Sequence, residues 1–199
     1  MIYQNITGII LAGGKSSRIG VNKSLLEIHG KKVIEYIKDI LITVFKNVIL
    51  ISNESSIYNF LNLPVYPDIH KNKGPLCGIH SGLNNSLNEK NFILSCDMPL
   101  VSKELINYIT KYWTKKNIIV TSVNGKIQPL CGIYKKSTVP YIERQLNDVQ
   151  AGNFSIHKLL DTTESEIIEI SDKDFYTENI FFNINNKEDY YNIKRILAV

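Results

Sequence analysis

Short, continuously apolar segments alternate along the chain with longer segments in which apolar residues recur every three or four positions. The continuous segments, residues 7–11, 47–51 and 91–95, are typical of strands that are buried on both faces. Residues 31–45 show the helical spacing instead. The pattern therefore predicts buried strands that are separated by helices.

The rest of the chain continues this alternation. In residues 102–113, Ser102 is placed to cap a helix whose apolar face extends to Trp113. Asn124-Gly125 is a strong hairpin signal between two strands. The other expected elements are a short helix from Ser55, a strand around Val65, helices at 74–87, 139–146, 154–160 and 187–197, and strands at 117–123, 126–134 and 166–170.

Strands that are apolar throughout and separated by helices predict an α/β fold. We expect a three-layer, Rossmann-like sandwich in which helices cover both faces of a mostly parallel sheet. In such sheets ligands bind at the carboxyl ends of the strands. The residues that directly follow a strand are therefore the first candidates for chemistry.

Length and composition fit one globular domain. The chain has 199 residues, of which 44% are hydrophobic and 21% charged, which excludes disordered, collagen-like and coiled-coil proteins. Residues 1–7 lack a basic region followed by an apolar core, and no apolar run approaches the roughly 18 residues of a membrane span. We expect a single domain over residues 1–199, in a cytoplasmic protein without a membrane segment.

The net charge of +4 comes from 23 basic and 19 acidic residues that are spread along the chain. Nucleic-acid-binding proteins concentrate their basic residues instead, so we expect no nucleic-acid partner. Cys77, Cys96 and Cys131 are far apart and odd in number, which excludes a complete disulfide framework and a zinc site. We expect reduced, half-buried thiols.

A glycine-rich, basic segment follows the first expected strand: Leu11-Ala12-Gly13-Gly14-Lys15-Ser16-Ser17-Arg18-Ile19-Gly20-Val21-Asn22-Lys23. It fits neither the P-loop pattern nor the dinucleotide fingerprint. Adjacent glycines nevertheless let successive backbone N–H groups turn toward one anion, and Lys15, Arg18 and Lys23 add positive charge. A flexible basic turn is the alternative, but three cations directly after a buried strand favour a polyphosphate-binding loop.

The order of residues from Leu11 to Leu26 resembles the signature of the MobA-like nucleotidyltransferases, a group of molybdenum cofactor guanylyltransferases. The resemblance implies a fold of the nucleotide-diphospho-sugar transferase type. It also implies that Arg18 and Lys23 take part in catalysis. The nucleotide-binding residues that it implies in this segment are Leu11, Ala12, Gly13, Gly14, Lys15 and Lys23. This chain has Asn22 where the family usually has Asp before the signature lysine.

The third buried strand is followed by Cys96-Asp97-Met98-Pro99. A carboxylate at a strand end can hold a cation, and Mg²⁺ commonly takes one or two carboxylates together with substrate phosphates. A turn or helix-cap role for Asp97 is the alternative. Because the four residues resemble the metal-binding element of the family, we expect Asp97 to be a catalytic residue and a Mg²⁺ ligand that also contacts the nucleotide.

Two further polar residues follow strands. Asn53 comes after the second strand and Asp68 after Val65, and by resemblance both match positions that line the guanine and ribose pocket. A carboxylate can accept hydrogen bonds from the guanine N1–H and N2–H₂ edge or from ribose hydroxyls. Each residue taken alone is more typical of a turn.

Acceptor binding is implied for two segments in the second half of the chain. Gln128 and Pro129 stand where the family builds its acceptor face, and Asn183-Ile184-Asn185 resembles its Asn-x-Asn element. In an extended segment Asn183 and Asn185 would face the same side, although a helix cap is nearly as good an interpretation of Asn185 or Asn186. The family often has arginine near residues 151–155, and this chain has none there.

The resemblance implies Mg²⁺-dependent transfer of GMP from GTP to molybdenum-bound molybdopterin, which yields the guanine dinucleotide cofactor and pyrophosphate. Residues up to about 100 would bind the nucleotide and residues from about 101 the acceptor. Transient contact with proteins that handle the molybdenum cofactor, or with apo-molybdoenzymes, is also implied. The alternatives are another nucleotidyltransferase of the same fold, such as a molybdopterin cytidylyltransferase or a sugar-phosphate nucleotidyltransferase, and a non-catalytic nucleotide-binding module.

Overall fold

A seven-stranded sheet with the strand order β5-β4-β1-β6-β8-β7-β9 forms the centre of the molecule. We describe it from a computed structural model, for residues 2–13, 22–148 and 154–198. The strands are β1 (Tyr3–Leu11), β4 (Phe45–Ile51), β5 (Val65–Tyr66), β6 (Lys90–Ser95), β7 (Ile118–Val123), β8 (Lys126–Lys135) and β9 (Ser165–Glu169). Strand β8 is antiparallel to both of its neighbours, and all other pairs are parallel. The expected mostly parallel sheet is thus confirmed.

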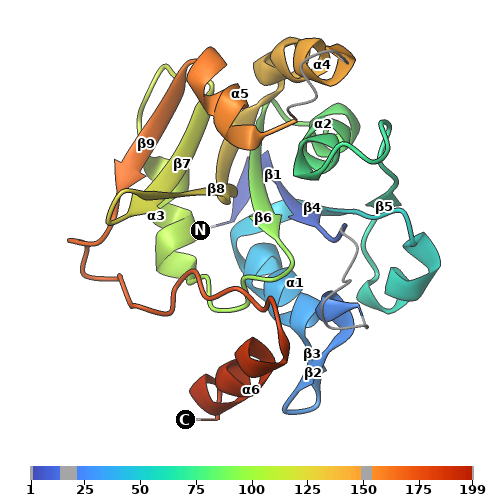
Figure 1. Ribbon diagram of the computed structural model, residues 1–199, viewed down its shortest axis with the longest axis vertical. Coiled ribbons are helices and arrows are strands. Elements are labelled where there is room, and N and C mark those ends of the chain that lie inside the picture. The colour runs from blue at the N-terminus through green and yellow to red at the C-terminus, as the bar shows by residue number, and fades with distance from the viewer. Residues whose placement is uncertain (1, 14–21, 149–153, 199) are drawn as a thin grey trace.

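Helices cover both faces of this sheet (Figure 1). On one face α1 (Val33–Val44) and α3 (Lys103–Lys111) bury their apolar sides against the strands. On the other face lie α2 (Pro75–Asn85), α4 (Val139–Asn147) and α5 (Ile156–Thr162). The three-layer α/β sandwich predicted from the alternation of strands and helices is therefore the observed fold.

A third, smaller core lies apart from the sheet. Helix α6 (Lys187–Ile196) packs against a two-stranded hairpin of β2 (Glu27–Ile28) and β3 (Lys31–Lys32), and Figure 1 shows both beyond one end of the sheet. Ile28, Val33, Ile184 and Ile193 are fully buried between them. The last helix thus rests on the segment that follows the glycine-rich loop. Three 3₁₀ helices complete the described elements: η1 (Lys23–Leu25), η2 (Ser55–Leu61) and η3 (Lys136–Thr138).

Several expectations need correction. Helix α3 ends at Lys111, so Trp113 lies beyond it and is 81% exposed instead of packing on the helix face. The short helix expected from Ser55 is present, and its type is 3₁₀. Cys77 and Cys131 are fully buried and not half-buried, whereas Cys96 is half-buried as expected.

The carboxyl ends of three parallel strands coincide. Leu11 at the end of β1 is paired with Ile51 of β4 on one side and with Ser95 of β6 on the other. The β7–β8 hairpin turns at Asn124-Gly125 beyond the same edge, and both turn residues have positive φ, as the predicted turn requires. No helix among the described residues is long and apolar enough to cross a membrane.

Candidate functional site

Strand β1 delivers the start of the glycine-rich loop to the carboxyl edge of the sheet. The Ala12 amide donates to the Ile51 carbonyl at 3.0 Å, and the Leu11 carbonyl accepts from the Cys96 amide at 3.1 Å. Leu11 and Ala12 are buried, while Gly13 is exposed. The loop therefore leaves the sheet between the ends of β4 and β6. Gly14, Lys15 and Arg18 lie outside the described residues.

Asp97 follows β6 at this edge. Its Oδ1 atom is buried and has no hydrogen-bond partner among the described residues, and its backbone carbonyl accepts from the Ile184 amide at 3.2 Å. Burial, together with the neighbouring Asp97 charge, raises the pKa of the Cys96 thiol to about 12, so this cysteine stays protonated. Of the two neighbouring residues Cys96 and Asp97, Asp97 is therefore the one that offers an acidic group.

The unpartnered Oδ1 of Asp97 fits a divalent metal ion. A buried carboxylate oxygen without a partner is costly, and a hard cation is the ligand that offsets this cost. No cluster of three or more His, Cys, Asp or Glu side chains that could hold a metal occurs in the described part of the chain. Water and substrate phosphates commonly complete the coordination of an ion that a protein holds through one carboxylate.

Lys23 lies in η1, directly after the undescribed part of the loop. Its Nζ donates to Asn185 Oδ1 at 3.3 Å, and Asn185 directly follows Ile184, whose amide donates to the Asp97 carbonyl, so Lys23 lies close to the end of β6. The backbone amide of Asn185 in turn donates to Asp189 Oδ2 at 2.7 Å, and Asp189 lies in the capped first turn of α6. The last helix thereby sets the position of a side chain that contacts the signature lysine.

Asn53 and Asp68 face each other across the ends of β4 and β5. Asn53 Nδ2 donates to Asp68 Oδ2 at 2.8 Å, and the Asp68 amide donates to Asn53 Oδ1 at 3.1 Å. Gly78 lies beside this pair, because a Cβ there would be 3.8 Å from Asp68 Oδ1 and 3.2 Å from Leu11 Cδ2. The two residues expected to share a pocket are therefore in direct contact.

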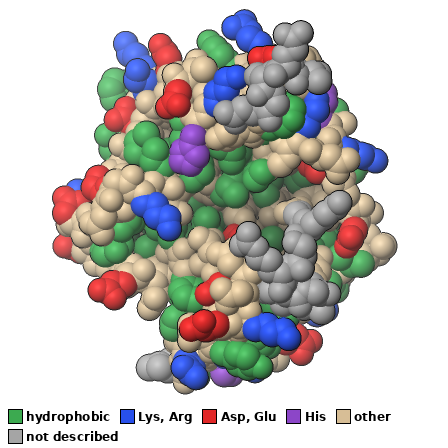
Figure 2. All heavy atoms as spheres, in the orientation of Figure 1, with side chains coloured by type: hydrophobic (Ala, Val, Ile, Leu, Met, Phe, Trp, Pro, Cys, Tyr) green, Lys and Arg blue, Asp and Glu red, His purple; other side chains and the backbone are tan. Residues whose placement is uncertain are grey.

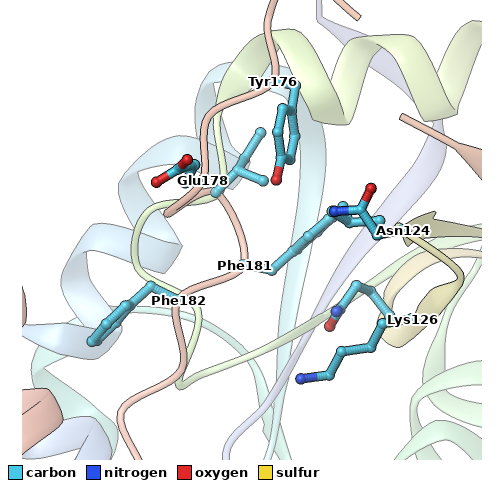
Figure 3. Close-up of a pocket in the computed structure, with 9 residues that line it drawn as sticks. Asn124, Lys126, Tyr176, Glu178, Phe181 and Phe182 are labelled. Atoms are coloured by element: carbon cyan, nitrogen blue, oxygen red, sulfur yellow. The ribbon is translucent and has the colours of Figure 1, made fainter. Parts of the chain in front are cut away.

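A cavity of about 430 Å³ lies between the β7–β8 hairpin and residues 176–182. It is lined by Val123, Asn124, Lys126, Gln128, Tyr176, Glu178, Ile180, Phe181 and Phe182. Figure 3 shows Tyr176, Phe181 and Asn124 grouped together, with the Lys126 side chain from the hairpin to one side of them. Aromatic faces and polar groups on one wall suit a planar, polar ligand.

The four residues expected at the acceptor are in different surroundings. Gln128 is buried and lines the cavity, and the Pro129 carbonyl accepts from the Tyr134 hydroxyl at 2.6 Å. Asn183 donates to the Phe181 carbonyl at 3.1 Å, whereas Asn185 contacts Lys23. Asn183 and Asn185 therefore differ in their partners.

Charged side chains are dispersed over the face that Figure 2 presents. Hydrophobic side chains gather in the middle of this face, and the Lys and Arg side chains drawn in colour are separated from one another around it. On this face the described residues form no basic stripe of the kind that nucleic acids require.

Sequence reasoning missed two sets of residues. Lys126 and Tyr176 of the cavity carry no local motif, and Asn124 was predicted only as a turn residue, because the cavity forms only when distant segments pack together. The hydrogen bonds that Tyr58 forms with Asn22 and Ser24 were missed as well. The sequence signal for these contacts was Asn22 itself, a polar residue of a type that caps helices, directly before the signature lysine.

Comparisons with known proteins place the chain in a family. The family described as "MobA-like NTP transferase domain" matches residues 8–165. A protein of Carboxydothermus hydrogenoformans, named "Probable molybdenum cofactor guanylyltransferase", is 35% identical over 98% of both chains. A solved structure from Aquifex aeolicus is 32% identical and has a TM-score of 0.76, over 92% of this chain and 94% of that one.

A second solved structure supports the fold alone. It is the "Molybdopterin-guanine dinucleotide biosynthesis protein A" of Archaeoglobus fulgidus, with a TM-score of 0.80 and 22% identity over 96% of this chain and 98% of that one. The family match spans the glycine-rich loop, Asn53, Asp68, Asp97 and the β7–β8 hairpin. The chain belongs to the MobA-like NTP transferase family.

Proposed function

We propose that the protein transfers GMP from GTP to molybdenum-bound molybdopterin, forming the guanine dinucleotide cofactor and pyrophosphate. The observation that carries this proposal is the meeting of Lys23, Asp97 and the start of the glycine-rich loop at one sheet edge. The relative from Carboxydothermus hydrogenoformans, which matches over nearly the whole chain, supports the choice of nucleotide and acceptor.

In this reaction a phosphate oxygen of the acceptor attacks the α-phosphorus of GTP. The new P–O bond forms as the bond to the β-phosphate oxygen breaks, and pyrophosphate leaves with that oxygen. The acceptor oxygen is already anionic, so no protein nucleophile is needed. The barrier comes from bringing anions together, and positioning with charge neutralisation lowers it.

The cations of the loop segment carry out this neutralisation. Lys23, held at the edge of the sheet, would contact the triphosphate together with Arg18, Lys15 and the backbone amides of Gly13 and Gly14. The contact of Lys23 with Asn185 is with a neutral oxygen. A charged phosphate binds an ammonium group more strongly than a neutral amide oxygen does.

Enzymes of this kind generally use a divalent metal, and we take Mg²⁺ as the ion here. Asp97 would hold it through the buried Oδ1 atom that lacks a protein partner. When bound, the ion neutralises charge on the phosphates. The protein contributes the carboxylate, fixed at the end of β6 and next to a protonated thiol.

The Asn53–Asp68 pair is the candidate site for the base and ribose. The Asp68 carboxylate would accept from the guanine N1–H and N2–H₂ groups or from the ribose hydroxyls, with Asn53 fixing its orientation. Apart from Asn185, which contacts Lys23, the proposed nucleotide-binding residues lie before about residue 100. Gln128, Pro129 and Asn183 from the second half, with the nearby cavity, would receive the acceptor. We also take the reaction to be cytoplasmic, with delivery of the product to molybdoenzymes.

Product identification tests this proposal. The protein is incubated with GTP, Mg²⁺ and molybdenum-bound molybdopterin, and the mixture is analysed by mass spectrometry and for pyrophosphate. We expect the guanine dinucleotide cofactor and pyrophosphate in equal amounts. Binding of GTP without either product would instead identify a nucleotide-binding module.

A further inference from the structure

Three side chains form a closed set of hydrogen bonds behind the signature lysine. Asn22 Nδ2 donates to Tyr58 Oη at 3.0 Å, and Tyr58 Oη lies 2.8 Å from Ser24 Oγ. Ser24 Oγ donates to Asn22 Oδ1 at 2.8 Å, which closes the ring. We call Asn22, Ser24 and Tyr58 the hydroxyl–amide ring.

The proton positions in this ring follow from its donors and acceptors. The Ser24 backbone amide donates to Asn22 Oδ1 at 3.1 Å, which fixes the oxygen of the Asn22 amide on that side and its nitrogen on the side of Tyr58. If the Ser24 hydroxyl also donates to Asn22 Oδ1, the Tyr58 hydroxyl is left to donate to Ser24 Oγ. Each of the three side chains then donates once to the next one.

The ring is rigid and stays neutral. Tyr58 and Ser24 are each only 1% exposed, and burial raises the pKa of Tyr58, so its hydroxyl keeps its proton at neutral pH. A buried polar network in which every member has a partner fixes the positions of its members. Tyr58 belongs to η2, which follows β4 and Asn53, so the ring ties two segments of the nucleotide site together.

Lys23 is the residue between Asn22 and Ser24. Both of its neighbours are bound to the same buried phenol, and the Leu25 and Leu26 amides donate to the Asn22 and Lys23 carbonyls at 3.1 and 3.2 Å. The backbone of Lys23 is therefore held on both sides. Its side chain leaves this anchored turn toward Asn185.

We propose that Asn22 and Tyr58 are positioning residues, which set the backbone from which Lys23 reaches the triphosphate, and that the ring requires an amide at position 22. This inference rests on the proposed function only in taking Lys23 as a contact of the nucleotide. Neither Asn22 nor Tyr58 needs to touch the substrate.

A carboxylate at position 22 breaks the ring for a reason of proton count. Asp at this position has no N–H to donate, so the Tyr58 hydroxyl would have to turn and donate to the carboxylate. The Tyr58 and Ser24 hydroxyls would then supply two protons for the three oxygen–oxygen contacts of the ring, so that one contact, such as the one between Ser24 Oγ and Tyr58 Oη at 2.8 Å, is left without a proton. Two buried oxygens facing each other without a proton repel, and the turn that carries Lys23 must shift.

The test compares Asn22→Asp, Tyr58→Phe and the double variant with the wild-type protein. Asn22→Asp should weaken equilibrium binding of Mg²⁺-GTP about 10-fold, as expected for a buried polar group that loses its partner. Tyr58→Phe removes one oxygen of the repelling pair. In that background Asn22→Asp should therefore weaken binding by only about 2-fold. Asn59→Asp, on the exposed side of η2, adds the same charge and should leave binding unchanged.

Binding of Mg²⁺-GTP is measured directly, so the result is independent of whether the acceptor has been identified correctly. If the wild-type protein binds GTP but makes no dinucleotide, the proposed function fails while the four binding constants still test the ring. Thermal unfolding of each variant is recorded alongside. Unchanged GTP affinity in Asn22→Asp, a loss equal to that in Asn59→Asp, or single-variant losses that simply multiply in the double variant would overturn the inference. The inference would also be overturned if the wild-type protein bound no nucleotide.

Discussion

The ammonium group of Lys23 lies 3.3 Å from the side-chain oxygen of Asn185, which is 162 positions later in the chain. Asn185 is held by the first turn of α6, and α6 packs on the hairpin that directly follows η1. The beginning and the end of the chain thus meet at the lysine that we assign to the triphosphate. The last helix contributes to the nucleotide site by placing a neutral acceptor beside this cation.

Replacing this neutral acceptor with a charged one should weaken GTP binding. In Asn185→Asp the carboxylate would form an exposed ion pair with Lys23 that the phosphates must displace, at a cost of about 1 kcal/mol or a roughly 5-fold higher KM for GTP. Steady-state kinetics at saturating acceptor measure this change. Asn192→Asp, on the same helix, adds the same charge as a control, and equal KM values in both variants would contradict the assignment.

Asp97→Asn should abolish most of the activity without harming the fold. Losing one electrostatic contact with the reacting phosphates typically costs about 10² to 10³ in rate. Since Oδ1 is buried without a partner among the described residues, removal of its charge should leave the melting temperature unchanged or raise it. Near-normal turnover at saturating Mg²⁺ would show that Asp97 is not a ligand of the metal ion.

Asp68→Asn should act on the choice of base. If the carboxylate accepts from the 2-amino group of guanine, the wild-type protein should prefer GTP to ITP, which lacks that group, by about 10-fold. The preference should disappear in Asp68→Asn, because an amide nitrogen then faces a donor. The measured quantity is the ratio of kcat/KM for the two nucleotides. If the ratio is the same in Asp68→Asn as in the wild type, the Asp68 carboxylate would instead contact only the ribose or only the loop.

Glu169 at the end of β9 should make the β7–β8 hairpin sensitive to acid. Its carboxylate accepts from Ser122 Oγ and from the amides of Asn124, Gly125 and Ser171 at 2.9 to 3.2 Å. Loss of solvation acts in the opposite direction, but this carboxylate is largely exposed. The hydrogen bonds, including those of Ser171, Gly125 and Ser122, nevertheless lower the pKa of Glu169 from 4.5 to about 2.

The sign of the effect follows from this depressed pKa. The carboxylate stabilises the fold fully above pH 4.5, and this stabilisation is lost as the pH falls from 4.5 toward 2. Urea unfolding of Glu169→Gln should therefore show lower stability than the wild type at pH 7, with a difference that shrinks toward pH 2. Glu164→Gln, at an exposed position nearby, provides the control. A difference that is independent of pH would show that the charge of Glu169 is irrelevant.

The sheet and its helices could be predicted because each element carries its own pattern. The apolar segments 47–51 and 91–95 became β4 and β6, and the Asn124-Gly125 turn became the β7–β8 hairpin. The strands β2 and β3 are two residues long, too short for any periodicity. Trp113 was misplaced because its spacing fits a helix that ends two residues earlier.

The site was predictable as far as strand ends reveal it. Asn53 and Asp68 were both expected at one pocket, and they are in contact. The contact of Lys23 with Asn185 and that of Asn22 with Tyr58 join segments with no shared local pattern. Such contacts depend on how α6 and η2 pack in three dimensions, which residue spacing does not encode.

The central claim is guanylyl transfer, and a nucleotide panel tests it most directly. Pyrophosphate release is measured with GTP, CTP, ATP and UTP, each with Mg²⁺ and with or without molybdenum-bound molybdopterin, using Asp97→Asn as the inactive control. We predict release that requires the acceptor, is fastest with GTP, and falls about 10² to 10³-fold in the control. Faster release with CTP, or equal release without the acceptor, would contradict the account.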